Sequence, residues 1–394
     1  MVKRLSRTRR RSVAIAVGAA VVALAAGCGS SSSSSSSASG SASASASSSG
    51  SGSGSTQAAA AQAIVTKAEA VPTSIAITTP LSKKPPTGKT IVFLRCSTAV
   101  CGGYMEGLTP AAAALGWTIK SIPFTQTPEG IQSAVTQAIN DKPSGIFYTG
   151  IDVSLVTKQL AAAQAAGIPI VNADVPDAPG GAVKAIIQGN AGTAAGSKLP
   201  ADWIAANGGG DTLVVNIPTY PILVTGTNAF IAELKQMCPS CKTTVLNQQV
   251  TDVGTALPAA VVSALQRNPS IKNVAFAFGD MTLGVYPALK AAGLTGIRLV
   301  NFGASSPSEV TATAQGQLQA SLAWSLPYTS WRALDTLARV FIGQSTVDDT
   351  VAPVPQMLLT KQNAASQVPT PVSSFQFAGP ANFPTQFEKL WGVS

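Results

Sequence analysis

The sequence predicts an α/β protein built from two doubly wound, Rossmann-like lobes. From Thr90 onward, short β-rich segments alternate with alanine-rich helical segments, and several of the β segments are apolar throughout. Continuous apolar runs are typical of parallel strands covered on both faces, and strand–helix alternation is typical of parallel sheets flanked by helices. The roughly 300 residues of this alternation exceed what one sheet accommodates, so we expect two lobes.

The N-terminus has the organisation of an export signal. Residues 1–11 carry six of the 26 basic residues, and Ser12–Ala26 is an apolar stretch that is short for a membrane span but suits a signal-peptide core. Small residues then lead directly into Cys28, which resembles the lipobox of bacterial lipoproteins, where the cysteine thiol receives a diacylglycerol. We therefore expect a signal peptide over 1–27 and a lipid anchor at Cys28 on the extracytoplasmic face of the cell membrane. An ordinary secretory peptide is the alternative.

A low-complexity region follows the cysteine. Ser30–Ser55 is nearly pure Ser, Ala and Gly, and residues 56–88 are rich in Ala, Thr and Pro, with room for one short helix. Such a tract has little apolar surface to bury, so it cannot offset the entropy cost of becoming ordered. We expect residues 28–88 to form a disordered tether behind the lipidated cysteine.

Composition excludes several classes of function. The basic residues outside the N-terminus nearly balance the 17 acidic ones, so no basic stripe is available for nucleic acid. Histidine is absent, which removes His-based acid/base chemistry, Ser-His-Asp triads and His-ligated metals. The chain also lacks a P-loop, a Gly-x-Ser-x-Gly elbow and a Gly-x-Gly-x-x-Gly turn after its first strand. We expect no enzyme activity, no metal, no cofactor and no nucleic-acid partner.

Ten strands and seven helices are expected in the folded part. The strands are Thr90–Leu94, Thr118–Ile122, Gly145–Thr149, Ile168–Asn172, Lys184–Gln188, Thr212–Ile217, Thr243–Val250, Asn273–Phe278, Arg298–Phe302 and Gln319–Trp324. The helices are Gly103–Leu115, Gly130–Asn140, Ser154–Ala166, Thr193–Ala206, Thr225–Met237, Leu257–Arg267 and Leu283–Ala292. Gly116, Gly167 and Gly293 follow apolar helix faces, where a glycine favours the helix end.

Several short sequence stretches in the folded part are each weak indicators of a family, but their order and spacing together are specific. They are Gly107–Thr109 with Ala114–Trp117, Ala165–Asp174, Gly189-Asn190 with Gly196, Phe276–Asp280, and Leu283-Gly284 with Ala288–Gly293. Through them the chain from about residue 89 onward resembles the type I periplasmic-binding-protein family, in its ribose/galactose-type sugar-binding branch. The resemblance implies a three-strand hinge, with crossings near Gly189-Asn190, around Ser325–Thr329 and within Thr350–Leu358. We expect residues 89–189 and 326–353 in an N-terminal lobe, and residues 190–325 and 354–394 in a C-terminal lobe.

The loops at the strand ends hold the candidate ligand contacts. Ligands of open α/β sheets lie beyond the carboxyl ends of the strands, and two facing lobes bring those loops to one cleft. Candidates from the N-terminal lobe are Arg95, Ser97, Thr98, Tyr104, Asp152 and Asp174. The loop after the first strand is either a contact or merely structural, Tyr104 faces either cleft or core, and Asp152 is a helix cap, a ligand contact or both. Asp174 matches the position at which the family's sugar binders place a carboxylate for sugar hydroxyls.

The C-terminal lobe offers a weaker match. Its candidates are Tyr220, Thr225, Asp280, Phe302 and Trp324. Trp324 is either a stacking partner for a ligand ring or a core residue.

Several of the family's polar positions are replaced in this chain. Val175 stands where the family commonly has an arginine after its aspartate, and Gly226 stands where a second arginine is expected. Gly303 replaces a second sugar-binding aspartate, and Ser325 replaces a hinge glutamine. We therefore expect a sugar or a sugar-like, less hydroxylated ligand.

Cys96, Cys101, Cys238 and Cys241 remain after the lipobox cysteine is set aside. An even number in an exported protein predicts disulfides, and proximity pairs Cys96 with Cys101 and Cys238 with Cys241. The second pair also has the spacing of a redox motif or of half a metal site. That motif normally opens a helix, whereas here it follows one.

The function that these features predict is solute capture for an importer. An anchored, tethered, bilobal protein would bind a small molecule by hinge closure and deliver it to an ABC-type permease and its ATPase. The alternative is a surface sensor with the same cleft that signals to a membrane receptor kinase.

Overall fold

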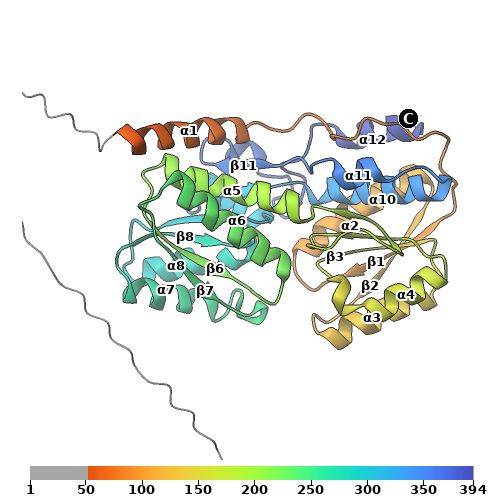
Figure 1. Cartoon of the computed structure of the whole chain (residues 1–394), viewed down its shortest axis with the longest axis horizontal. Helices are drawn as coiled ribbons and strands as arrows, with labels where there is room; N and C mark the ends of the chain where they lie inside the picture. The colour runs from red at the N-terminus through yellow and green to blue at the C-terminus, as the bar shows by residue number, and fades with distance from the viewer. Residues whose placement is uncertain (1–51, 394) are drawn as a thin grey trace, which may run out of the picture. The chain divides into compact units, whose positions relative to one another are not determined.

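The computed structural model describes residues 52–393, which form two α/β lobes (Figure 1). The predicted signal peptide, Cys28 and the first part of the predicted tether lie outside the described residues. Among residues 52–393, none of the helices combines the length and the apolar character that a membrane crossing requires.

The N-terminal lobe is built on a five-stranded parallel sheet with the order β2-β1-β3-β4-β5. Its strands are β1 (Thr90–Arg95), β2 (Thr118–Pro123), β3 (Gly145–Thr149), β4 (Ile170–Ala173) and β5 (Val183–Ile187). Its crossover helices are α2 (Val100–Leu115), α3 (Pro128–Asn140) and α4 (Thr157–Ala165), with a 3₁₀ turn η1 (Val153–Leu155) before α4. Local signals set several helix ends: the Thr127 hydroxyl caps α3, and Gly116 ends α2 at φ 67°.

The C-terminal lobe repeats the same winding in a six-stranded sheet with the order β11-β10-β9-β8-β6-β7. Its strands are β6 (Asp211–Asn216), β7 (Thr243–Asn247), β8 (Ile271–Phe276), β9 (Arg298–Asn301), β10 (Ala320–Ala323) and β11 (Met357–Thr360), of which β11 runs antiparallel to β10. Its helices and 3₁₀ turns are α5 (Asn190–Ala206), α6 (Pro221–Met237), η2 (Val250–Asp252), α7 (Leu257–Arg267), η3 (Gly279–Thr282), α8 (Val285–Ala291), α9 (Pro307–Ala314) and η4 (Ala364–Gln367). The fold class predicted from the sequence is confirmed.

Between β1 and β11 the chain passes from one lobe to the other three times. It does so between β5 and α5, between β10 and α10 (Leu326–Ile342), and between α11 (Val347–Val351) and β11. Helix α10 contacts α2, β4 and β5, so it belongs to the N-terminal lobe. These three passages are the places at which one lobe can rotate against the other.

The C-terminal helix lies on a different lobe from the one the sequence predicts. Helix α12 (Phe383–Trp391) packs on α10, and the rings of Trp331 and Trp391 stack with their centroids 5.2 Å apart (Figure 1). Its apolar face is completed by Phe387, which is fully buried. The assignment of all of 354–394 to the C-terminal lobe is therefore wrong for this helix, because its apolar face finds its partner on α10.

Residues 52–88 are ordered in the structure, which corrects the prediction of a disordered tether reaching residue 88. Helix α1 (Gly52–Ala68) packs on α5 and buries Val65 in the core of the C-terminal lobe. The following segment continues onto the N-terminal lobe, where the Ile75 carbonyl accepts a hydrogen bond of 2.6 Å from the Tyr328 hydroxyl. The order comes from tertiary contacts, which local composition does not reveal. We call residues 69–88 the strap, because the segment has partners on both lobes.

The middle of the strap contacts a buried ionic network of the N-terminal lobe. Arg339 lies 2.7 Å from Asp335 and 3.0 Å from Asp349, and it donates a hydrogen bond of 2.7 Å to the carbonyl of Thr79 in the strap. Trp391 donates its indole N–H to Asp335 at 2.6 Å. Arg332, also in α10, donates to the carbonyls of Asp349 and Ala352 beside the third passage between the lobes. One cluster thus joins α10, α11, α12 and the strap.

Candidate ligand-binding site

A cavity of about 180 Å³ lies between the carboxyl ends of the strands of both sheets. The N-terminal lobe lines it with Cys96, Thr98, Val100, Cys101, Tyr104, Phe124, Gln126, Ile131, Thr149, Gly150, Ile151 and Asp174. The C-terminal lobe and the hinge line it with Thr193, Ser197, Tyr220, Ile222, Leu223, Gly226, Val250, Ala277, Phe278, Phe302, Gly303, Ala304, Leu322 and Trp324. The loops after β1 and β3 in one sheet and after β6 and β8 in the other contribute, and these are the strand pairs at which strand order reverses and doubly wound sheets bind ligands.

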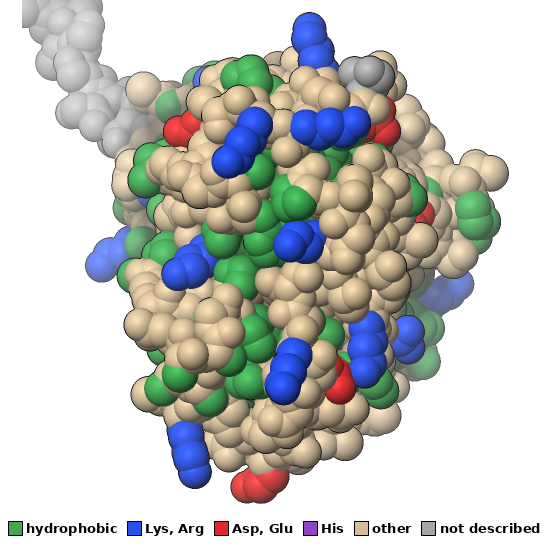
Figure 2. Space-filling model, turned by 90° about the vertical axis from the view of Figure 1, so that its right-hand side faces the viewer, with side chains coloured by type: hydrophobic (Ala, Val, Ile, Leu, Met, Phe, Trp, Pro, Cys, Tyr) green, Lys and Arg blue, Asp and Glu red, His purple; other side chains and the backbone are tan. Residues whose placement is uncertain are grey.

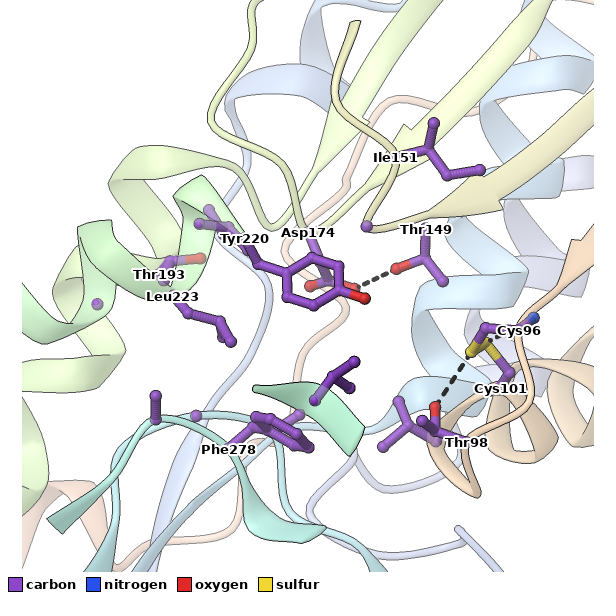
Figure 3. A pocket seen from close by; sticks show the side chains of 18 of the residues that line it. Cys96, Thr98, Cys101, Thr149, Ile151, Asp174, Thr193, Tyr220, Leu223 and Phe278 are labelled. Atoms are coloured by element: carbon purple, nitrogen blue, oxygen red, sulfur yellow. Dashed lines mark hydrogen bonds between the residues drawn. A yellow bond between two sulfur atoms is a disulfide. The ribbon is translucent and has the colours of Figure 1, made fainter. Parts of the chain in front are cut away.

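Asp174 is the chemical centre of the cavity. Its Oδ2 accepts a hydrogen bond from the Tyr104 hydroxyl. The same oxygen accepts a hydrogen bond of 2.8 Å from the Thr149 hydroxyl (Figure 3). Its Oδ1 has no donor among the described residues, so this oxygen is available to a ligand. Burial raises the pKa of Asp174 to about 6, while the two hydroxyl donors act in the opposite direction. Burial, followed by the negative charge of Asp174, raises the pKa of Tyr104 well above its usual range, so its hydroxyl stays a donor.

The backbone at Asp174 explains how the carboxylate is presented. The residue has φ 55°, in the left-handed region that Asp and Asn tolerate better than most residues. It directly follows β4, whose last residue, Ala173, is fully buried. The chain therefore turns as soon as the strand ends, and the side chain projects into the cavity.

The loop after β1 is closed by the predicted disulfide. Cys96 and Cys101 are bonded, and Thr98 between them lines the cavity with its hydroxyl 3.1 Å from the Cys96 sulfur. Ser97 instead donates to Gln126 at 3.1 Å, and Gln126 donates to the Tyr220 hydroxyl at 3.1 Å. This last bond joins the two lobes across the cavity. The second predicted disulfide, Cys238–Cys241, is also formed and lies just after α6.

The C-terminal lobe provides an apolar wall. Figure 3 shows Leu223 and Phe278 pointing into the space that Asp174 and Tyr220 also face. Phe302 is fully buried and stacks on Phe230 with a centroid distance of 4.7 Å. The glycine that follows it is required by the backbone, because a Cβ at Gly303 would lie 2.0 Å from the carbonyl oxygen of Ala277. The family's aspartate at this position therefore has no room here.

Trp324 lies at the hinge end of the cavity wall. It is 5% exposed, and its indole Nε1 is buried without a hydrogen-bond partner among the described residues. An unmatched buried N–H costs free energy. Trp324 is thus both buried and part of the cavity wall. The sequence left open whether it is a core residue or a stacking partner for a ligand ring, and its position is compatible with both.

Six of the eleven candidate contacts predicted from the sequence line the cavity. They are Thr98, Tyr104, Asp174, Tyr220, Phe302 and Trp324. Arg95 and Ser97 are exposed and do not line it, because the disulfide-closed loop turns Thr98 toward the cavity instead. Thr225 also lies outside the lining and donates to the Asn190 side chain of α5 at 2.9 Å.

The two remaining aspartates do not line the cavity. Asp152 precedes η1 without making a capping bond, and the carboxylate of Asp177 accepts from the Val153 N–H in its place. Burial and then the charge of Asp177 raise the pKa of Asp152 to about 6. Asp280 is buried in η3, where burial raises its pKa and the Ser306 hydroxyl opposes the shift. The structure thus places neither carboxylate in the lining, because the end of a strand positions a loop but does not set the direction of its side chains.

Other lining residues were not predicted. Thr149 is the last residue of β3, Gln126 follows β2, and Phe278 follows β8, so all three obey the strand-end rule. Leu223 lies in the first turn of α6 and carries no polar signal in the sequence. Within residues 52–393, no group of three or more Cys, Asp and Glu side chains is arranged to hold a metal ion.

Comparisons with known proteins agree with this geometry. The family model described as "Periplasmic binding protein domain" matches residues 99–345, well over half of the chain. No curated protein sequence is similar enough to count as a relative of the chain.

Solved structures show the same fold at low identity. One is an ABC transporter solute-binding protein from Agrobacterium vitis bound to α-D-tagatopyranose, with 20% identity and a TM-score of 0.61, covering 72% of this chain and 97% of that one. Another, from Actinobacillus succinogenes 130z with bound D-allose, has 19% identity and a TM-score of 0.60, covering 71% of this chain and 99% of that one. A third, an ABC sugar transporter subunit from Rhodobacter sphaeroides 2.4.1, has 21% identity and a TM-score of 0.61, covering 70% and 99%. Together with the family match, the two lobes and the cavity between them establish that the chain belongs to the periplasmic binding protein family.

Proposed function

We propose that this protein is an extracytoplasmic solute-binding protein that captures a small molecule between its lobes and delivers it to an ABC-type importer. The observation that carries the proposal is the cavity, which collects side chains from the carboxyl ends of both sheets. The solved structures of similar fold include solute-binding proteins holding tagatose, allose and allitol. Sugars and sugar-like, less hydroxylated molecules are therefore the ligands to test first.

Hinge closure is the proposed mechanism of capture. Both lobes contribute to one cavity, and the chain passes between them at three places. A ligand that contacts both walls binds the closed form more tightly than the open form, so it shifts the population toward closure. The Gln126–Tyr220 hydrogen bond is one contact that closure can make and opening can break.

We propose that the lipobox cysteine anchors the protein and that residues 29–51 separate the anchor from the folded part. Replacing Cys28 with Ser should release the protein from the membrane fraction of a bacterial host. Retention of the C28S variant in that fraction would refute lipid anchoring without touching the proposal of solute binding.

The direct test of solute binding is a thermal-shift screen of the full chain against sugars, polyols, aromatic acids and amino acids. A ligand at one hundred times its Kd should stabilise the folded state by about 2.7 kcal/mol, which is a readily measured shift. Small-angle X-ray scattering should then show compaction with the ligand that scores highest. If no compound binds, or if the best ligand leaves the scattering unchanged, capture by closure is excluded.

A further inference from the structure

The cavity contains one charged side chain. Among the described residues that line it, Asp174 carries the charge, and the lining includes neither lysine nor arginine. Arg95, at the end of β1, is exposed and outside the lining. The groups that contact the Asp174 carboxylate are the neutral hydroxyls of Tyr104 on α2 and Thr149 on β3.

The two positions at which the family resemblance leads us to expect an arginine supply no cation here. Val175 follows Asp174 and is 1% exposed, so an arginine there would have to be buried. Gly226 borders the cavity on α6, and a Cβ there would lie 2.8 Å from the Ser197 hydroxyl. A partly buried carboxylate that has only neutral donors loses solvation without gaining a counter-charge, and a bound cation can supply that counter-charge.

The remaining wall does not suit a heavily hydroxylated ligand. Ile222, Leu223, Phe278 and Phe302 present carbon surfaces to the cavity. Ser197 donates its hydroxyl proton to the Phe302 carbonyl at 2.9 Å, so this proton is not available to a ligand. Each sugar hydroxyl placed against such a wall would lose its hydrogen bonds to water without replacement, and that loss weakens binding.

We propose that the ligand is a compact organic cation, with an apolar body and one protonated amine that binds Oδ1 of Asp174. The apolar body lies against Leu223 and Phe278, and the ring of Tyr220 faces the same space as the carboxylate, where an aromatic face attracts a cation (Figure 3). The inference rests on the proposed function and names the chemical class of its solute.

The pH dependence of binding follows from this pairing. An amine needs Asp174 ionised, and the pKa of that carboxyl is raised to about 6 in the ligand-free protein. Below that pH the amine must displace a proton, so its affinity should fall by up to about tenfold per pH unit. A neutral ligand that accepts or donates an ordinary hydrogen bond has no such requirement.

The test compares matched ligands by isothermal titration calorimetry with the full chain. 2-Phenylethylamine and cyclohexylmethylamine are paired with 2-phenylethanol and cyclohexylmethanol, and D-ribose and D-galactose represent the sugars. At pH 7.5 the better amine should bind at least about tenfold more tightly than its alcohol, because hydrogen bonds between charged partners are about twice as strong as neutral ones. Its affinity should decrease at pH 5.

Asp174→Asn is the informative variant, since asparagine tolerates the left-handed backbone at this position and keeps an acceptor without the charge. It should remove the preference for the amine and flatten the pH profile. Asp152→Asn is the matched control, because Asp152 has the same raised pKa of about 6 but lies outside the cavity lining. This control should leave the amine's affinity and its pH profile unchanged.

The outcomes separate this inference from the proposed function. Tight binding of a sugar or an alcohol, with amines weaker or equal, would overturn the cationic ligand and leave solute capture intact. An amine preference that survives in Asp174→Asn would also overturn it. If no probe binds and the wider thermal-shift screen is empty, both proposals fail together.

Discussion

The N-terminal lobe holds carboxylates in two regions, and their hydrogen-bond and ion-pair partners differ. Beneath the lobe, Asp335 and Asp349 lie against Arg339 and near Arg332, and all four side chains are at most 1% exposed. In the cavity, Asp174 has two neutral hydroxyl donors and no cation. The chain therefore supplies counter-charges where helices must be held together, and leaves the counter-charge out where a ligand can enter.

The same contrast recurs with two buried indoles. Trp391 in α12 donates its N–H to Asp335 at 2.6 Å, whereas Trp324 in the cavity wall has no acceptor among the described residues. Both rings are buried, with exposures of 1% and 5%. We infer that the N–H of Trp391 contributes to stability, whereas that of Trp324 contributes none through a hydrogen bond within the described residues.

The largest effect should follow from breaking the matched network. Arg339→Met removes the cation between Asp335 and Asp349 and also the donor to the strap carbonyl of Thr79. Removing one partner of a buried ion pair leaves an uncompensated charge and costs about 3–5 kcal/mol. Urea unfolding of the full chain should show a loss of that size.

Lys198→Met is the control for that loss. Lys198 pairs with Glu233 at 3.0 Å but is 47% exposed, so this pair contributes at most about 1 kcal/mol. Equal losses in the two variants would show that the buried network is no more important than a surface pair.

A smaller loss is expected from Trp391→Phe. The ring can still stack near Trp331, but Oδ1 of Asp335 loses its indole donor. Leaving a buried acceptor unmatched costs about 1–3 kcal/mol. Thermal unfolding should therefore shift downward, and an unchanged midpoint would mean that the indole N–H contributes no stability.

Carboxyl groups whose pKa is raised by burial make the stability of the protein depend on pH. Burial raises the pKa of Asp174 and of Asp152 to about 6, and that of Asp202 and Glu309 to about 7. These groups bind protons more tightly in the folded state than in the unfolded state, so their contribution is greatest at low pH and is lost as the pH rises through 6 to 7. The lowered pKa of Asp211 acts in the opposite direction, but below pH 4.

The ligand-free protein should consequently unfold at a higher temperature at pH 5 than at pH 8, by on the order of a few degrees. Calorimetric scans across this range provide the measurement. Asp174→Asn should reduce the slope, since it removes one titrating group. A midpoint that rises with pH over this range contradicts the assignment.

Sequence patterns located the cavity because strand ends are local features. Asp174 and Thr98 each follow an apolar strand, and the topology of parallel sheets carries them to one place. Asp152 and Asp280 satisfy the same rule and still lie outside the lining, because side-chain direction depends on packing that a strand pattern does not encode.

The strap and α12 could not be predicted for a different reason. Their stabilising contacts join distant parts of the chain, such as the bond between Ile75 and Tyr328, 253 residues apart. Residues 69–88 contain few apolar side chains, and the local composition resembles that of a disordered segment. Ile75 and Ile77 are nevertheless 3% exposed, because α10 and α12 together form a surface that receives them.

The smallest change in stability is expected at the unmatched indole. Trp324→Phe removes an N–H that has no acceptor among the described residues, so the variant loses apolar area but also loses a buried unsatisfied donor. These two terms oppose each other, and the free energy of unfolding should change by less than about 1 kcal/mol, well below the change in Trp391→Phe. If Trp324→Phe destabilises the protein as much as Trp391→Phe does, the indole N–H of Trp324 contributes to stability, and the contrast between the two indoles does not hold.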